Sequence, residues 1–280
     1  MNIGVIISRW EPQYAVSTST MLLTIDIGNT NITCGVFEVD GGTCGYVPAA
    51  RWRIATEPSR QPDEYGLILT ELLARGGFGS NELTAVALCS VVPPLTVTFI
   101  ELCASYFSLD PLVVGAGVKT GIRVLYDTPR DVGADRIADA VAALKLYGGP
   151  VVIVDFGTAT VFDAISGSGE YIGGAIAPGM TVAADALFHR SSMLRRVELE
   201  RPASAIGKNT VHALQSGLIL GYADLVKGMV ARFDRELGGG AKVVATGGLA
   251  DLIEPETGCF DVVNQNLTLA GLKIIHHLNV

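Results

Sequence analysis

Apolar residues along the chain gather in short runs that end at turns rich in glycine, asparagine and aspartate. Runs of this kind predict strands, whereas apolar residues spaced at about 3.6 positions predict helices. In the first part of the chain the predicted elements are strands at 22–27, 31–39 and 50–55, a helix at 63–75, a strand at 85–89, a helix at 94–107 and a strand at 112–114. Strands come first and alternation follows, which is typical of an α/β fold.

The same order restarts after a helix predicted at 135–147. The elements predicted there are strands at 151–155, 158–165 and 171–176, helices at 181–188 and 210–237, a strand at 242–245, and helices at 249–253 and 267–278. The two starts align, Asp26-Ile-Gly-Asn-Thr30 with Asp155-Phe-Gly-Thr158. An internal duplication of this kind predicts two similar α/β domains whose glycine turns face each other across a cleft. We expect an extension at 1–20, a first domain at 21–134 and a second at 135–280.

Composition excludes several classes of protein. Hydrophobic residues make up 49% of the 280 residues and charged ones 17%, so intrinsic disorder is excluded. The net charge of -8 argues against a nucleic-acid partner, because cations are needed to displace counterions from phosphates. The five cysteines are scattered without Cys-x-x-Cys spacing, which favours a reducing cytoplasm over disulfides or zinc. The high apolar content also favours a buried dimer interface.

Two segments raise the question of export or membrane insertion. The uncharged stretch 83–100 is long enough to span a bilayer, but Pro93-Pro94 lies in its middle, so a strand, a turn and a helix are predicted instead. In residues 1–20, Arg9 and Glu11 interrupt the apolar run, which does not fit a secretory signal. Two alternatives stay open for this extension: it results from a mis-chosen start codon, or it is a functional arm.

The candidate chemistry begins at the first aligned turn. A strand that ends in Asp26, followed by Gly28, Asn29 and Thr30, offers amides and hydroxyls to a phosphate, while the carboxylate holds Mg²⁺ directly or through its waters. An ordinary hairpin turn is the alternative, since these residues also favour turns. The second copy at Asp155 strengthens the phosphate interpretation.

A third glycine turn follows the strand at 242–245. Here Thr246-Gly247-Gly248 allows close approach to a flat ligand such as adenine, with a simple strand-to-helix loop as the alternative. In this order the three turns resemble the phosphate 1, phosphate 2 and adenosine motifs of the acetate and sugar kinase, Hsp70 and actin superfamily. No Gly-x-Gly-x-x-Gly follows a strand, and Gly207-Lys-Asn-Thr210 departs from a Walker loop.

The segment 126–137 carries the remaining polar candidates. Asp135 stands at the start of the helix predicted at 135–147, where it acts either as a helix N-cap or as a carboxylate that accepts a hydroxyl proton during phosphoryl transfer. Arg136 beside it is suited to a bidentate contact with a substrate carboxylate, or is a solvated surface arginine.

Five ordered motifs resemble the type III pantothenate kinase family. They are Asp26-x-Gly-Asn-Thr30, Gly133-Ala-Asp-Arg136, Asp155-Phe-Gly-Thr-Ala-Thr160, Gly173-Gly-Ala-Ile-Ala-Pro-Gly179 and Ile206-Gly-Lys-Asn-Thr210. The resemblance runs from Met21 almost to the end of the chain. It implies two duplicated ribonuclease H-like, actin-like ATPase domains with a cleft between them.

The resemblance also implies roles for individual residues. Those implied to bind ATP are Asp26, Ile27, Gly28, Asn29, Thr30, Asn31, Ile32, Thr33 and Thr158. Those implied to contact pantothenate are Tyr126, Gly133, Ala134, Asp135, Arg136 and Thr210. Asp135 would be the proton acceptor, and Asp155 would hold a monovalent cation, K⁺ or NH₄⁺, beside Mg-ATP.

The implied activity is phosphorylation of pantothenate by ATP to 4'-phosphopantothenate, the first step of coenzyme A biosynthesis. The resembled family forms homodimers, and a cytoplasmic enzyme without nucleic-acid or membrane partners is expected. Two other functions stay open: an ATP-binding regulatory accessory protein, and a superfamily kinase for another small hydroxy acid. Retention of Asp135 with the phosphate-turn residues favours an active enzyme.

Overall fold

The computed structural model describes residues 20–39, 45–191 and 194–280. Nearly all of the predicted extension, residues 1–19, lies outside the described residues. The first sheet has five strands in the order β3-β2-β1-β4-β5. Its strands are β1 (Met21–Ile27), β2 (Asn31–Glu38), β3 (Ala50–Ala55), β4 (Leu83–Ser90) and β5 (Leu112–Val113).

The second sheet has six strands in the order β11-β10-β7-β8-β9-β6. Its strands are β6 (Arg123–Val124), β7 (Val151–Phe156), β8 (Ala159–Ile165), β9 (Glu170–Pro178), β10 (Lys242–Thr246) and β11 (Val262–Val263). In each sheet an antiparallel run of three strands, β1-β2-β3 or β7-β8-β9, is followed by parallel strands on the other side of β1 or β7. The predicted mixed α/β fold with two sheets is confirmed.

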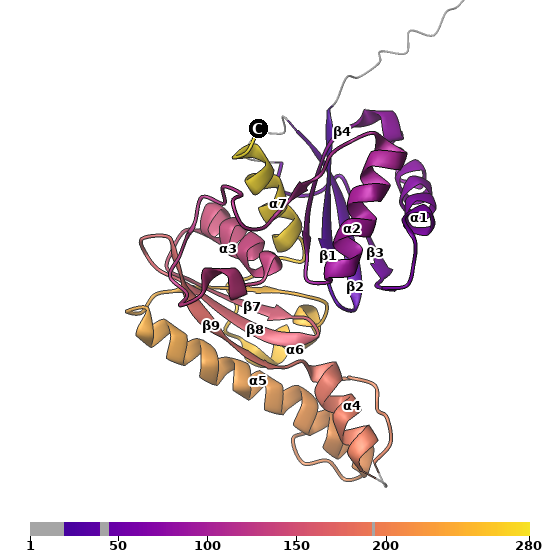
Figure 1. The fold of residues 1–280 in the computed structure, drawn as a ribbon. Helices are drawn as coiled ribbons and strands as arrows, with labels where there is room; N and C mark the ends of the chain where they lie inside the picture. Colours follow the sequence, from indigo (N-terminus) through magenta and orange to yellow (C-terminus); the bar gives the residue numbers. More distant parts are fainter. Residues whose placement is uncertain (1–19, 40–44, 192–193) are drawn as a thin grey trace, which may run out of the picture.

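The helices form layers around the two sheets (Figure 1). They are α1 (Pro62–Arg75), α2 (Pro93–Leu102), α3 (Ala134–Tyr147), α4 (Met180–Arg190), α5 (Thr210–Glu236), α6 (Ala250–Thr257) and α7 (Leu267–His277). Helices α1 and α2 cover the outer face of the first sheet, and α5 and α6 cover the outer face of the second. Helices α3 and α7 pack between the sheets.

The central strands are apolar along their whole length because both of their faces are covered. In β7, Val152 and Val154 belong to the core under α5, whereas Val151 and Ile153 belong to the core shared with α3. Successive side chains of a strand point to opposite faces, so a strand buried on both sides shows a continuous apolar run instead of an alternating one. This is why the run before Asp155 predicts a strand correctly.

Helix α7 crosses back to the first sheet although it follows the second sheet in the chain. At its contact with α3, a methyl group on Gly271 would overlap the carbonyl oxygen of Ala138, so only glycine permits this approach. At the other side of α7, the ammonium group of Lys273 donates to the carbonyl oxygens of Glu38 and Gly45, each at 2.8 Å. The helix thereby joins the two sheets.

The uncharged stretch 83–100 forms strand β4 and the start of α2, as predicted. No helix among the described residues is both long and apolar enough to cross a membrane. The helix predicted at 94–107 is regular only to Leu102, because a π-helical turn at Cys103–Phe107 ends it with Ser108 in the left-handed conformation. Strands β6 and β11 were not predicted.

Candidate active site

The two aligned turns lie against each other. In the first, the amide of Gly28 donates to the carbonyl oxygen of Asn31 at 3.0 Å. In the second, the amide of Gly157 donates to the carbonyl oxygen of Ala159 at 3.0 Å. A hydrogen bond of 2.8 Å joins the hydroxyl groups of Thr30 and Thr158, 128 positions apart in the chain. The fold therefore brings both turns to one point, with Asn29, Thr30 and Thr158 exposed to solvent there.

A carboxylate stands at the end of each strand that leads into these turns. Burial, followed by the charge of Asp135, raises the pKa of Asp26 from 3.8 to about 7. The thiol of Cys89, which donates to Oδ1 of Asp26 at 3.4 Å, lowers that pKa in part. Burial and the charges of Asp135, Asp26 and Asp163 raise the pKa of Asp155 to about 7 as well. Asp26, Asp135 and Asp155 thus form one cluster of interacting carboxylates.

Asp139 completes this acidic group, and sequence reasoning missed it. It lies one helical turn after Asp135 on α3 and is 3% exposed. Burial and then the charge of Asp155 raise its pKa well above the usual value, although a hydrogen bond from Thr268 offsets part of this. Its Oδ1 has no hydrogen-bond partner among the described residues. The signal in the sequence was the i,i+4 spacing of two aspartates on one helix face.

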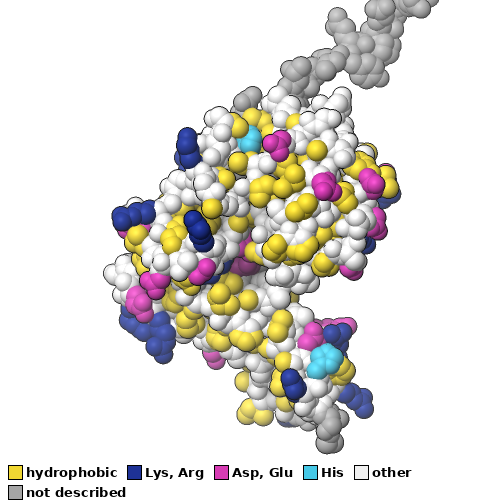
Figure 2. Space-filling view, in the orientation of Figure 1, with side chains coloured by type: hydrophobic (Ala, Val, Ile, Leu, Met, Phe, Trp, Pro, Cys, Tyr) yellow, Lys and Arg dark blue, Asp and Glu magenta, His cyan; other side chains and the backbone are white. Residues whose placement is uncertain are grey.

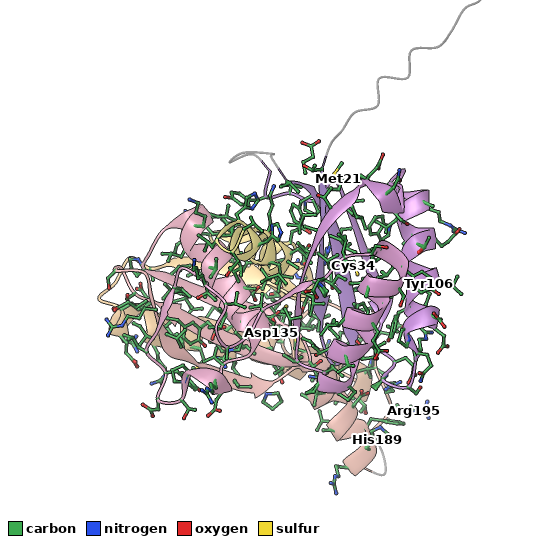
Figure 3. The ribbon with its side chains drawn as sticks, turned by 45° about the horizontal axis from the view of Figure 1, so that its top comes forward. Met21, Cys34, Tyr106, Asp135, His189 and Arg195 are labelled. Carbon is green, nitrogen blue, oxygen red and sulfur yellow. The ribbon has the colours of Figure 1, made fainter. Side chains whose placement is uncertain are left out.

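Asp135 lies in the first turn of α3, in the middle of the molecule (Figure 3). The N-cap residue of α3 is Gly133, so the alternative role of Asp135 as the N-cap is wrong in position. Its Oδ1 accepts a hydrogen bond of 2.8 Å from the amide of Arg136. No hydrogen bond is made by Oδ2 within the described part of the chain, so this oxygen is available to accept a proton.

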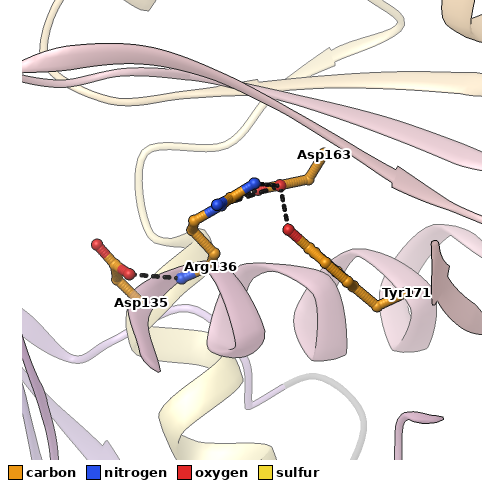
Figure 4. A network of polar contacts seen from close by, with 4 residues as sticks. All are labelled: Asp135, Arg136, Asp163 and Tyr171. Carbon is orange, nitrogen blue, oxygen red and sulfur yellow. Dashed lines mark hydrogen bonds and ion pairs between the residues drawn. The ribbon is translucent and has the colours of Figure 1, made fainter. Parts of the chain in front are cut away.

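Arg136 is fixed by a network that Figure 4 shows. Its Nη2 and Nε donate to Oδ1 of Asp163 at 2.6 and 3.1 Å, and the hydroxyl of Tyr171 donates to the same oxygen at 2.6 Å. The side chains of Arg136 and Asp163 are only 12% and 2% exposed, so Arg136 is not a solvated surface arginine. The ring of Tyr126 packs at 6.3 Å from that of Tyr171. A substrate carboxylate at this point would share Arg136 with Asp163.

The network lies against a glycine of the fourth motif. A methyl group on Gly174 would overlap the backbone carbonyl oxygen of Phe162 and would lie 2.8 Å from both Nη2 of Arg136 and Oδ1 of Asp163. Close contact with the neighbouring strand β8 therefore requires glycine here, and the backbone of β9 passes directly against the ion pair. Neither Asp163 nor Tyr171 was predicted as a site residue. A carboxylate within the apolar strand 159–165 was the available signal.

Thr210 is the one predicted site residue that the described chain keeps away from the others. It begins α5, whose N-cap Asn209 accepts the amide of His212 at 2.9 Å. In Figure 1 this end of α5 and helix α4 project as an arm beyond the second sheet, away from α3 and the two turns. Figure 3 places His189 and Arg195 on the same arm and Asp135 far from it.

The carboxylates fit a cation by their chemistry, because oxygen ligands suit both Mg²⁺ and K⁺, and no basic side chain among the described residues forms an ion pair with Asp26, Asp139 or Asp155. The described residues hold no cluster of three or more His, Cys, Asp or Glu side chains arranged to bind a metal ion alone. An ion at Asp26 or Asp155 would therefore need further ligands from substrate phosphates, backbone or water, which is the usual manner of Mg²⁺ in phosphoryl-transfer sites.

Solved structures of other proteins share this fold, and the description of one of them names a bound nucleotide analogue. The activator of 2-hydroxyisocaproyl-CoA dehydratase from Clostridium difficile, with bound ADPNP, matches with a TM-score of 0.53 and 12% identity over 92% of this chain and 94% of that one. The ethanolamine utilization protein EutJ from Carboxydothermus hydrogenoformans matches with a TM-score of 0.52 and 16% identity over 91% and 89%. The fold is that of the actin-like ATPases and sugar kinases.

Sequence relatives are closer. Type III pantothenate kinase 2 of Symbiobacterium thermophilum is 53% identical over 91% of this chain and 96% of its own length. The type III pantothenate kinase of Roseiflexus sp. is 53% identical over 92% and 99%. The family model of type III pantothenate kinase matches residues 22–232. The chain therefore belongs to the type III pantothenate kinase family.

Proposed function

We propose that this protein transfers the γ-phosphoryl group of ATP to the hydroxyl of pantothenate, giving ADP and 4'-phosphopantothenate, the first step of coenzyme A biosynthesis. The observation that carries the proposal is the meeting of the two glycine turns at Thr30 and Thr158 beside Asp135 in a chain of this family. A coupled assay for ADP release tests it. Turnover with pantothenate supports the kinase, turnover with only another hydroxy acid changes the substrate, and ATP binding without turnover favours a regulatory protein.

Asp135 is proposed as the general base. Its Oδ1 is held by the amide of Arg136, which leaves Oδ2 to accept the proton of the substrate hydroxyl as the oxygen attacks the γ-phosphorus. In the transition state the leaving ADP oxygen and the attacking oxygen lie in line. The residues 26–33 and Thr158 would hold the phosphates by backbone amides and side-chain hydroxyls.

Cations offset the negative charge of this arrangement. Mg²⁺ would be held by the nucleotide phosphates with Asp26, directly or through water, and would supply Lewis-acid stabilisation of the developing charge. A monovalent cation, K⁺ or NH₄⁺, is proposed at Asp155. Support comes from the uncompensated burial of Asp155 next to Asp139 and Asp26.

Pantothenate is proposed to contact Tyr126, Gly133, Ala134, Asp135, Arg136 and Thr210. The first five lie at the start of α3 or against the Arg136 network, so one small carboxylic acid can reach them together. A remaining N–H group of the fixed guanidinium is proposed to bind the substrate carboxylate, while the hydroxyl end lies at Asp135. Thr210 lies on the projecting arm, away from the start of α3.

The two halves are proposed to be duplicated actin-like domains that close on the nucleotide. The matching order of strands around β1 and β7 supports this, with β6 as an addition to the second sheet. The division at 134–135 stays a prediction. The described cysteines, Cys34, Cys89, Cys103 and Cys259, are free thiols, consistent with the proposed cytoplasmic location.

A homodimer is proposed through the arm formed by α4 and α5. Between these helices lies an open apolar cavity of about 680 Å³. Its lining includes Val182, Leu187 and Tyr222, and Figure 2 shows hydrophobic side chains on this arm. An apolar surface of this kind is covered by a partner in many homodimers. Light scattering should give twice the mass of the chain, and Val182→Glu should give the single mass.

A further inference from the structure

Strand β3 carries two arginines that no step above uses. Along this edge strand Arg51 and Arg53 point to one face, while Trp52 and Ile54 point to the other and pack in the core under α1. Arg51 pairs with Gly35 of β2 and Arg53 with Thr33. A methyl group on Gly35 would lie 2.9 Å from Leu269 of α7, so the two arginines lie on the α7 side of the first sheet.

Across from these arginines lies the second half of the molecule. A cavity of about 370 Å³ is lined by Arg51, Arg53 and Trp52 on one side and by Gly248, Asp251 and Gln265 on the other. A methyl group on Gly248 would lie 3.3 Å from Nη1 of Arg53. Arg53 therefore reaches from β3 to the glycine turn between β10 and α6.

The cavity holds positive charge without a partner. Neither Arg51 nor Arg53 makes a hydrogen bond or ion pair among the described residues, and the one carboxylate of the lining, Asp251, accepts a hydrogen bond of 3.2 Å from Gln265. Burial and then the charge of Arg53 lower the pKa of Arg51. Elsewhere in the described chain arginines do pair with carboxylates, namely Arg75, Arg123, Arg136, Arg196 and Arg201. Two free guanidinium groups at one cavity suit an anion with several oxygens.

The position of the cavity indicates which anion it would bind. Thr33, the cross-strand neighbour of Arg53, is the last residue of the segment 26–33 proposed to bind ATP phosphates. On the opposite wall, a methyl group on Gly247 would overlap Oδ1 of Asp155, so this turn also borders the second phosphate turn. The arginine cavity therefore adjoins the place where a nucleotide would meet both halves.

We propose that Arg51 and Arg53 form a further binding site for the nucleotide, in which they hold the phosphates that are not transferred. The inference rests on the proposed function for the identity of the nucleotide. The charge of the two arginines would offset the negative charge of phosphates bound in this position. Arg53, which lies nearer the turn, contributes more than Arg51.

Isothermal titration calorimetry gives a direct binding assay for this cavity. ADP and pyrophosphate should both bind to the wild-type protein. Arg53→Ala should raise the Kd of ADP about 10- to 100-fold, with a smaller increase for Arg51→Ala and partial recovery for Arg53→Lys. Adenosine affinity should change little, and Arg75→Ala, whose arginine pairs with Glu71 on exposed α1, is the matched control.

Two results would overturn this site. One is an unchanged Kd of ADP in Arg53→Ala and Arg51→Ala proteins that melt normally. The other is pyrophosphate that still binds at Arg53 when ADP is saturating, which would make the cavity a separate anion site. ADP binding does not require turnover of pantothenate. The Kd of ADP can therefore be measured even if the proposed kinase reaction fails. If the wild type is active and the arginine variants keep their KM for ATP, the arginine site alone fails.

Discussion

The two hairpin turns that meet at Thr30 and Thr158 share a backbone plan but differ in their surroundings. Each follows a buried strand that ends in an aspartate with a pKa near 7. Asp26 of the first turn receives the thiol hydrogen bond of Cys89, and Asn29 and Thr30 add side-chain groups at the surface. Asp155 of the second turn receives no such hydrogen bond from the described residues and lies near Asp139, a buried acid.

The difference supports the proposal that one strand–turn frame serves two tasks. The first turn offers more side-chain donors and acceptors, which suits direct contact with phosphate oxygens. The second concentrates negative charge that only a cation or a proton can offset, because buried carboxylates without a base are costly. Substitutions in the two turns should therefore have different effects, and Asp135, which acts on both, should have the largest.

Asp135→Asn removes a carboxylate whose charge acts on both Asp26 and Asp155. It should reduce kcat by on the order of 10²- to 10⁴-fold, because an amide cannot take the substrate proton. ATP binding and folding should persist, since Oδ1 still accepts the amide of Arg136. Steady-state kinetics with a nucleotide-induced melting shift checks this. Near-normal turnover in a folded variant would reduce Asp135 to a helix-end residue.

Asn29→Gly and Thr30→Ala test the first turn alone. If these side chains hold ATP phosphates, kcat/KM for ATP should fall about tenfold to a few hundredfold, since each charge-assisted hydrogen bond contributes roughly 1.5–3 kcal/mol. The melting temperature without nucleotide should barely move, while the shift with Mg-ATP should shrink. Thr158→Ala is the counterpart in the second turn. Loss of stability without nucleotide, with a full ATP-induced shift, would show a purely structural turn.

Asp155→Asn and Asp26→Asn separate the two turns by their response to K⁺. In the wild type, K⁺ or NH₄⁺ should raise both activity (several-fold) and melting temperature above the values in Na⁺ at equal ionic strength. The thermal response to K⁺ should survive in Asp26→Asn and vanish in Asp155→Asn. Equal loss in both variants would place the cation between the turns, and a wild type indifferent to K⁺ would remove the monovalent ion from the mechanism.

The smallest expected effect concerns pH. Because the folded-state pKa values of Asp26 and Asp155 are raised from 3.8 to about 7, the folded protein binds more protons than the unfolded chain between these values. The free energy of unfolding contributed by these groups therefore falls as pH rises from about 4 to 7. The ligand-free protein should melt several degrees lower at pH 8 than at pH 5.5. Asp155→Asn and Asp26→Asn should each flatten this dependence, and an identical slope in all three proteins would contradict the shifts.

Much of the fold could be predicted from local pattern. The strands around Asp26 and Asp155 are long apolar runs closed by glycine turns, and the meeting of the turns follows from the repeat. Strands β6 and β11 have two residues each, too few to show any period. The π-helical turn after Leu102 continues an apolar helical pattern, so the sequence offers no break there.

The candidate site was less predictable, because its chemistry depends on tertiary neighbours. Asp139 and Asp163 are ordinary acids in the sequence, and only burial beside other charges makes them informative. Arg136 shows no sign of its ion pair with a residue 27 positions later. Arg51 and Arg53 alternate with apolar residues, as polar residues do in many edge strands. Only the folded structure shows that they line a cavity together with Gly248 of the other half.

Helix α7 has a consequence for how the chain acquires its structure during synthesis. The first sheet presents Leu22 of β1 and Phe37 of β2 to this helix, yet α7 leaves the ribosome only after the whole second sheet has been made. Until then the inner face of the first sheet lacks its cover, and an uncovered apolar sheet is prone to aggregation. The first half therefore keeps an uncovered apolar face until α7 has been synthesised, and we expect chaperones that shield this face to raise the yield of folded protein.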